Sequence, residues 1–140
     1  MSEPLQVVSV ARTRTRGGRE FGISRSLDGC LDVRLALPGS GRIGTTPEQL
    51  LAAAWSACFE TGIFNAARRA RIKLPAAFAI DAEITLATCD ESHELSARFI
   101  VSIPGMARDL AFQLIDEGHQ TCPYAVATRG NITVTVELAE

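Results

Sequence analysis

The stretch that decides the fold is TTPEQLLAAAWSACF, residues 45–59, because it has the features of a long buried helix. Thr46 suits the N-cap, Pro47 suits the first turn, and Gln49 completes a capping box with Thr46. The residues that follow are apolar nearly all round a helix, which indicates burial on more than one side. We therefore predict a helix from residue 47 to about residue 71, and a second subunit that covers part of it.

Two side chains on this predicted helix can do chemistry, the carboxylate of Glu48 and the thiol of Cys58. At a rise of about 1.5 Å per residue, the ten positions between them correspond to about 15 Å along the axis. The two groups therefore cannot share a hydrogen-bonded site within one helix.

The segments before the helix are predicted to form a three-stranded antiparallel meander. The strand candidates are residues 5–15, 21–26 and 30–37, and the last of these alternates apolar and polar side chains. Gly17 and Gly18 are predicted to form the first hairpin turn, because both accept a positive φ.

After the helix, the pattern predicts a second antiparallel pair at residues 78–88 and 94–103. A second helix is expected over 106–117, closed by Gly118, and a last strand over 131–138. Residues 119–124 are expected to be irregular, because Pro123 cannot continue a helix. The order βββ-α-ββ-α-β is typical of an α+β fold, and residues 1–140 are predicted to form a single domain.

Composition excludes several classes of partner. The net charge is −2 and the isoelectric point is near 5.7, so neither a nucleic acid nor an anionic membrane surface is favoured. The longest apolar run is far shorter than the roughly 20 residues of a membrane span. The first residues lack the basic-then-apolar order of a secretion signal. We expect a soluble cytoplasmic protein.

Four cysteines carry the remaining chemical interest: Cys30, Cys58, Cys89 and Cys122. Their spacings do not match a zinc site, and the His119 and Cys122 pair is too little for a metal, so no metal is expected. Cysteines of this kind are either small buried hydrophobes or redox groups. Cys122 precedes Pro123 and so is expected on a mobile non-helical segment, whereas Cys30 and Cys89 are expected to be structural.

Two longer stretches together resemble a known family. GTTPEQLLAAAWSACF (44–59) and HQTCPYAVATRGNITV (119–134) are similar to the two cysteine motifs of the organic hydroperoxide resistance proteins. Those proteins are one branch of the superfamily named for osmotically inducible protein C. GGRE (17–20), LDG (27–29), LDVRL (31–35) and IPG (103–105) match the same branch in order and spacing.

The resemblance implies a role for four residues. Cys58 would be the thiol that reacts with the peroxide, Cys122 the thiol that resolves it, and Arg19 and Glu48 the polar partners of Cys58. It also implies antiparallel sheets around a long buried central helix in an intertwined homodimer. Helix geometry then predicts that Glu48 of one chain approaches Cys58 of the other, while the subunit that supplies Arg19 stays open.

The activity implied is reduction of alkyl and fatty-acid hydroperoxides with no bound cofactor. Electrons would come from dihydrolipoyl groups on lipoylated acyltransferase subunits, recycled by lipoamide dehydrogenase. An arginine beside Cys58 would stabilise the thiolate, and Glu48 would hold that arginine in place. Five aromatic residues are candidates to line an apolar substrate pocket: Trp55, Phe59, Phe64, Phe112 and Tyr124.

Two other functions are weighed against this one. A cysteine hydrolase would need a histidine base near Cys58. A non-catalytic, stress-associated binding domain would use the cysteines for packing alone, and Cys58 and Cys122 would then stay unlinked after peroxide treatment.

Overall fold

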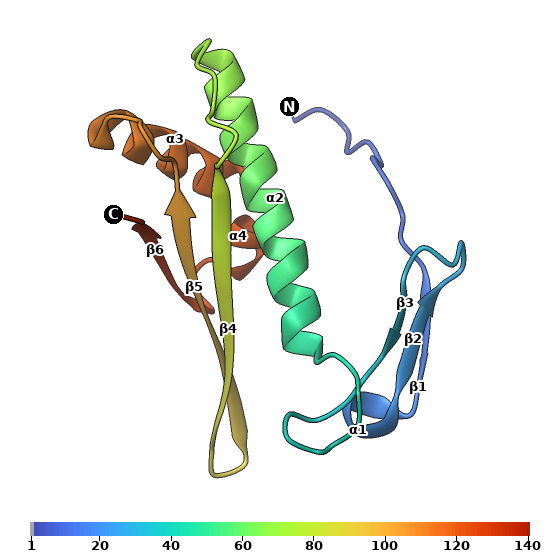
Figure 1. Cartoon of the computed structure of the whole chain (residues 1–140). Helices are drawn as coiled ribbons and strands as arrows, with labels where there is room; N and C mark the ends of the chain where they lie inside the picture. The colour runs from blue at the N-terminus through green and yellow to red at the C-terminus, as the bar shows by residue number, and fades with distance from the viewer. Residues whose placement is uncertain (1) are drawn as a thin grey trace. The chain divides into compact units, whose positions relative to one another are not determined.

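The computed structural model describes residues 2–140, and Figure 1 shows the course of the chain. Contacts within the chain form two compact units, one that ends at Pro47 and one from Glu48 to Glu140. Each unit contains a three-stranded sheet, and helices occur in both. The predicted α+β class is therefore confirmed, whereas the single domain over residues 1–140 stays a prediction.

The N-terminal unit contains β1 (Thr13–Arg16), β2 (Ile23–Ser26) and β3 (Asp32–Arg34), which pair antiparallel in that order. The predicted meander is confirmed, but its strands are shorter than their sequence patterns. Residues 2–12 are exposed, and the side chains of Leu5 and Val8 are almost fully accessible to solvent, so no packing extends the strand.

The turn after β1 differs from the prediction. A short helix, α1 (Gly18–Phe21), separates β1 from β2, so Gly17 and Gly18 do not form a two-residue hairpin. Both glycines have the expected positive φ, 88° and 67°. A Cβ on Gly17 would lie 3.0 Å from the backbone of Phe21, so this turn needs glycine for space as well as for φ.

The predicted long helix is α2 (Pro47–Arg69), and it begins at Pro47 as expected. One side is buried, by Trp55, Phe59, Gly62, Ile63, Ala66 and Ala67. The exposed positions follow one stripe: Gln49, Ala53, Ala57, Thr61, Phe64, Asn65, Arg68 and Arg69. Within one chain, α2 is therefore buried on one side, not all round.

The C-terminal sheet has the order β4-β5-β6. β4 (Ala79–Cys89) and β5 (Ser92–Ser102) form the predicted antiparallel hairpin. β6 (Thr133–Leu138) pairs parallel to β5, so the expectation of purely antiparallel sheets is wrong for this strand. The helices between β5 and β6 form the crossover that a parallel pair requires.

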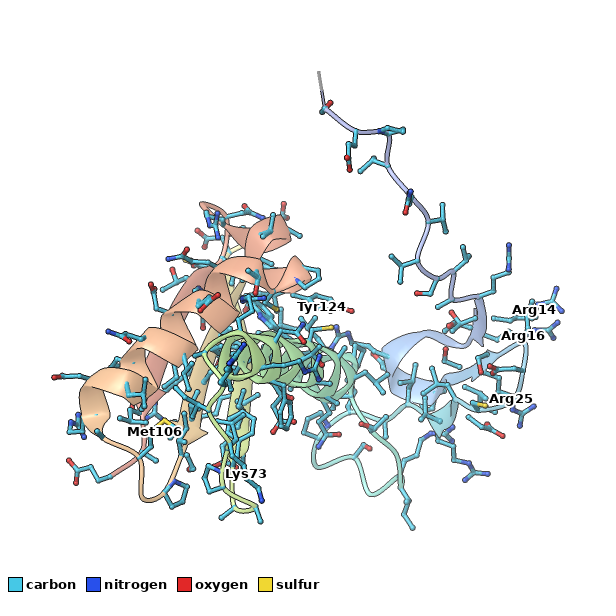
Figure 2. The ribbon with its side chains drawn as sticks, turned by 90° about the horizontal axis from the view of Figure 1, so that it is seen from above. Arg14, Arg16, Arg25, Lys73, Met106 and Tyr124 are labelled. Atoms are coloured by element: carbon cyan, nitrogen blue, oxygen red, sulfur yellow. The ribbon has the colours of Figure 1, made fainter. Side chains whose placement is uncertain are left out.

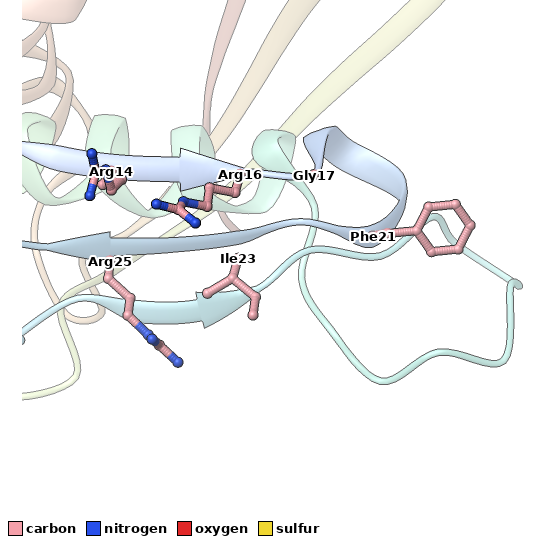
Figure 3. Close-up of a pocket in the computed structure, with 6 residues that line it drawn as sticks. All are labelled: Arg14, Arg16, Gly17, Phe21, Ile23 and Arg25. Carbon is pink, nitrogen blue, oxygen red and sulfur yellow. The ribbon is translucent and has the colours of Figure 1, made fainter.

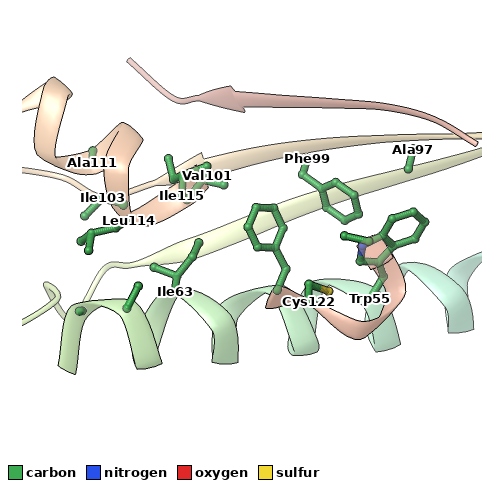
Figure 4. Close-up of a cluster of buried hydrophobic side chains, with 14 residues drawn as sticks. Trp55, Ile63, Ala97, Phe99, Val101, Ile103, Ala111, Leu114, Ile115 and Cys122 are labelled. Atoms are coloured by element: carbon green, nitrogen blue, oxygen red, sulfur yellow. The ribbon is translucent and has the colours of Figure 1, made fainter. Parts of the chain in front are cut away.

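The two faces of this sheet differ. Ala97, Phe99 and Val101 of β5 are buried in the core with residues of α2, and Figure 4 shows them on the side of the sheet that faces α2. On the other face, Arg98 donates to Glu137 at 2.8 and 3.0 Å and to Glu83 at 3.4 Å. This ion-pair network ties the three strands together.

Two helices join β5 to β6, α3 (Arg108–Thr121) and α4 (Pro123–Thr128). Gly118 therefore lies inside α3 and does not end it, and the predicted irregular segment 119–124 is wrong. Pro123 occupies the first turn of α4, where its missing N–H costs nothing. Cys122 is the extended residue between the two helices, with φ −65° and ψ 124°.

Candidate functional site

The two cysteines singled out by sequence both lie in the C-terminal unit. Cys122 belongs to the buried core with 1% of its surface exposed, and Cys58, which is half-buried, packs against the same core. Figure 4 shows Cys122 against α2, between Ile63 and Trp55. Both thiols are free. The structure thus brings together two residues that are far apart in sequence.

The surroundings of Cys58 disfavour its thiolate. Burial raises the pKa of the Cys58 thiol, and the neighbouring charge of Cys122 raises it further. A thiol with a raised pKa is a weak nucleophile at neutral pH. A cation close to the Cys58 sulfur would oppose both effects.

The polar residues implied as partners of Cys58 lie on different elements. Glu48 is in the first turn of α2, and the uninterrupted helix keeps it about 15 Å along the axis from Cys58. Arg19 is in α1 of the N-terminal unit. The roles of both residues remain predictions.

The five aromatic candidates occupy different environments. Trp55 and Phe59 are fully buried, and Trp55 contacts Phe99 and Tyr124 at centroid distances of 5.1 and 6.2 Å. Phe64 packs edge-on against Phe78, with 47% of its surface exposed.

Phe112 lines a hollow. The guanidinium of Arg108 lies 5.4 Å from its ring centroid, and 43% of the Phe112 surface is exposed. The hollow has a volume of about 180 Å³ and is also lined by Asp116, His119 and Glu137. A substrate pocket formed by these aromatics remains a prediction.

His119 is a residue of the site region that sequence reasoning considered only as a metal ligand. Its ring packs on Phe59 at 5.6 Å, and its Nδ1 is buried without a hydrogen-bond partner among residues 2–140. Burial lowers the pKa of His119, the charge of Arg129 lowers it further, and Asp116 opposes them. Its position three residues before Cys122, on the buried side of α3, is the signal that could have found it.

The N-terminal unit has an arginine-rich hollow beside α1. Its volume is about 460 Å³, and Figure 3 shows the residues that line it: Arg14, Arg16, Gly17, Phe21, Ile23 and Arg25. Arg14 lies directly across from Arg25, which pairs with Asp32 at 2.9 Å. All three arginines are exposed, and Figure 2 shows them close together in the N-terminal unit.

The other two cysteines are exposed. Cys30 follows a turn in which its N–H donates to Asp28, and Cys89 ends β4. Neither packs in the core. No three His, Cys, Asp or Glu side chains within residues 2–140 are arranged to hold a metal ion. In the same part of the chain, no helix has the length and apolarity that crossing a bilayer demands.

Comparison with known proteins gives a consistent result. Residues 39–137 match the family model described as OsmC-like protein. The organic hydroperoxide resistance protein of Xanthomonas axonopodis pv. citri (strain 306) is 38% identical, over 99% of this chain and all of that protein. The organic hydroperoxide resistance protein OhrA of Bacillus subtilis (strain 168) is 34% identical over the whole length of both.

Solved structures agree with the sequence relatives. The crystal structure of OhrB of Bacillus subtilis has a TM-score of 0.88 to this chain at 33% identity, covering 95% of this chain and all of that one. A Vibrio cholerae organic hydroperoxide resistance protein, solved with captopril in one of its active sites, has a TM-score of 0.87 at 29% identity. It covers 97% of this chain and 95% of its own.

Proposed function

Because the chain belongs to the OsmC-like protein family, we propose that it reduces organic hydroperoxides to alcohols with a pair of cysteines. Relatives named for organic hydroperoxide resistance cover its full length and support a role in that resistance. The observation that carries the proposal is that Cys58 packs against the core to which Cys122 belongs, and that Cys122 is near enough to raise the pKa of Cys58.

The reaction uses two thiols and one peroxide. The Cys58 thiolate attacks one peroxide oxygen, the O–O bond breaks, and the departing alkoxide takes a proton to become the alcohol. Cys58 is then a sulfenic acid. The Cys122 sulfur displaces its oxygen, which leaves as water with the Cys122 proton, and a disulfide forms. A dithiol reductant returns both sulfurs to thiols by exchange.

Arg19 and Glu48 complete the proposed site. Since burial and Cys122 raise the pKa of Cys58, an arginine at its sulfur would have to offset both effects. Arg19 is the residue that the family motif assigns to this task, and Glu48 would orient the guanidinium by a charge-assisted hydrogen bond.

A second copy of the chain is proposed to bring Glu48 and Cys58 together. The exposed stripe of α2 includes Ala53 and Ala57, and small residues of this kind allow another helix to approach. In a homodimer formed there, Glu48 of one chain lies near Cys58 of the other.

The proposed reductant is a dihydrolipoyl group carried by a lipoylated acyltransferase subunit and recycled by lipoamide dehydrogenase in the cytoplasm. A dithiol suits the site because it can open the Cys58–Cys122 disulfide and then close on itself. No bound cofactor is needed for this chemistry.

Turnover with dihydrolipoamide tests the proposal. We expect the wild type to consume cumene hydroperoxide faster than hydrogen peroxide, and Cys58→Ser to abolish the reaction. Cys122→Ser should react once and stop, because its sulfenic acid is not resolved. Equal slow rates in all three proteins would contradict the proposal and favour cysteines that only pack.

A further inference from the structure

Helices α2 and α3 meet at two glycines with no side chain between them. A Cβ placed on Gly62 would lie 2.6 Å from the carbonyl oxygen of Gly118, well inside the 3.4 Å at which ordinary contacts begin. A Cβ on Gly118 would lie 2.6 Å from Cγ1 and 2.8 Å from the backbone nitrogen of Ile63. Only glycine at both positions allows this approach.

The crossing lies one helical turn from each cysteine. Cys58 precedes Gly62 by four residues in α2, and Cys122 follows Gly118 by four residues at the end of α3. Positions four apart lie on the same face of a helix, so Cys58 lies on the side of α2 that faces α3.

A single backbone atom connects the crossing to Cys122. The Gly118 carbonyl oxygen, which a side chain at position 62 would strike, accepts a hydrogen bond of 3.1 Å from the N–H of Cys122. This bond caps the end of α3. A displacement of that carbonyl therefore moves the residue that must reach Cys58.

We propose that Gly62 and Gly118 are positioning residues that hold Cys122 in register with Cys58 for disulfide formation. The inference rests on the proposed function and identifies what makes its second step fast. In that step the Cys58 sulfenic S–O bond breaks, the S–S bond forms, and oxygen leaves as water with the Cys122 proton. The S–S bond tolerates Cα separations of only about 4.4–6.8 Å, so a small parting of the helices slows the step.

Helix propensity alone argues against glycine at both positions. Alanine is the better helix former, and glycine loses more backbone entropy on folding. The glycines are therefore explained by the close approach that they permit. The Cys58 thiolate attacks the peroxide without help from Cys122, so the crossing should affect the disulfide step and leave the first attack unchanged.

The test measures the equilibrium of the Cys58–Cys122 disulfide with reduced and oxidised dithiothreitol. Cys30→Ser and Cys89→Ser are present in every protein, so that only one pair exchanges. Gly62→Ala and Gly118→Ala are compared with the wild type. Val101→Ala is the matched control, because it removes core packing on β5, which is not one of the two helices that cross. The same equilibrium is also measured for the wild type unfolded in urea, which gives the disulfide stability of two cysteines that the fold does not position.

We expect each glycine variant to lower the effective concentration of the two thiols, Cys58 and Cys122, toward each other by roughly tenfold or more. This corresponds to a change of about 30 mV in the reduction potential of a two-electron couple. The rate of Cys58 oxidation by cumene hydroperoxide should not change. Unchanged disulfide stability in folded glycine variants would overturn the inference, as would an equal loss in Val101→Ala.

Two further outcomes keep the inference and the proposed function apart. If the glycine variants do not fold, the test compares the native wild type with the wild type unfolded in urea. A Cys58–Cys122 disulfide that is no more stable in the native protein than in urea overturns the inference. A native wild type that forms no Cys58–Cys122 disulfide at all would instead contradict the proposed function.

Discussion

The imidazole of His119 lies against the ring of Phe59, with centroids 5.6 Å apart and ring planes at 54°. Phe59 is fully buried and follows Cys58 on α2, while His119 comes three residues before Cys122. The contact therefore joins the two segments that carry the thiols. It also buries an ionisable group at that point.

His119 should make folding stability depend on pH. Its pKa is lowered in the folded protein, first by burial and then by Arg129. The unfolded chain therefore binds a proton at a higher pH than the folded chain. Stability should fall as the pH decreases from the ordinary histidine pKa toward the lowered one.

Urea unfolding at several pH values measures how the free energy of unfolding changes with pH, which is the slope that His119 should determine. We expect His119→Gln to flatten it, and His93→Gln to leave it unchanged, because His93 is exposed in the β4–β5 hairpin. An identical slope in wild type and His119→Gln would contradict the expectation.

Truncation of the core should separate two phenylalanines that look alike in sequence. Phe99 is fully buried between Trp55 and Phe59, whereas 43% of the Phe112 surface is exposed. Phe99→Ala should cost about 3–5 kcal/mol in the free energy of unfolding. Phe112→Ala should lower the free energy of unfolding clearly less. Chemical denaturation of both variants checks this, and equal losses of stability would contradict the placement of Phe99 in the core.

Arg19 should control the reactivity of Cys58. Burial and Cys122 raise the pKa of Cys58, so without a cation its thiolate appears only above the ordinary thiol range. The rate of alkylation of Cys58 is measured as a function of pH. The midpoint of this pH profile should be higher in Arg19→Gln than in wild type. A loss of roughly tenfold in rate at neutral pH is expected for each unit of pKa.

Arg16→Gln is the matched control, because Arg16 is an exposed arginine of the same unit that has no assigned role in the site. The same midpoint in Arg19→Gln and wild type would remove Arg19 from the proposed site.

Mixed dimers test whether Glu48 acts across subunits. Glu48→Gln and Cys58→Ser should each abolish peroxide turnover alone. Co-expressed, they form mixed dimers in which one site has Cys58 from one chain and Glu48 from the other. We expect these dimers to recover about half of the wild-type activity per dimer. No recovery in isolated mixed dimers would place Glu48 and Cys58 in one subunit.

Local patterns predicted the elements that local chemistry determines. The capping box placed the start of α2 at Pro47, and two strand-like runs predicted the β4–β5 hairpin. The last strand, predicted over 131–138, is observed as β6 at Thr133–Leu138. Each of these predictions depends on a pattern that lies within a short stretch of sequence.

The failures came from contacts between segments. Gly118 was expected to end a helix, but α3 continues through it to Thr121. Glycine stands at this position because α2 approaches closely at Gly62. Cys122 was expected in a mobile loop, and it is buried between two helices. The direction of β6 depended on a crossover whose helices were not recognised at 119–128. No local pattern carries this information.

The same division holds for the site. The family motif named Cys58 and Cys122, and the structure places both in one core. The spacing of His119 to Cys122 was a sequence signal, but the contact of His119 with Phe59 on α2 was not. The glycine crossing does not stand out in sequence, because its importance comes from the contact between α2 and α3.

One measurement tests the central claim most directly. The reduced protein is mixed with one equivalent of cumene hydroperoxide, quenched by alkylation, and digested for mass spectrometry of the disulfide-linked peptides. The account predicts one alcohol per chain and a single Cys58–Cys122 disulfide, with Cys30 and Cys89 still alkylated. Peroxide left unconsumed, or oxidation of Cys30 and Cys89 while Cys58 and Cys122 stay reduced, would contradict it.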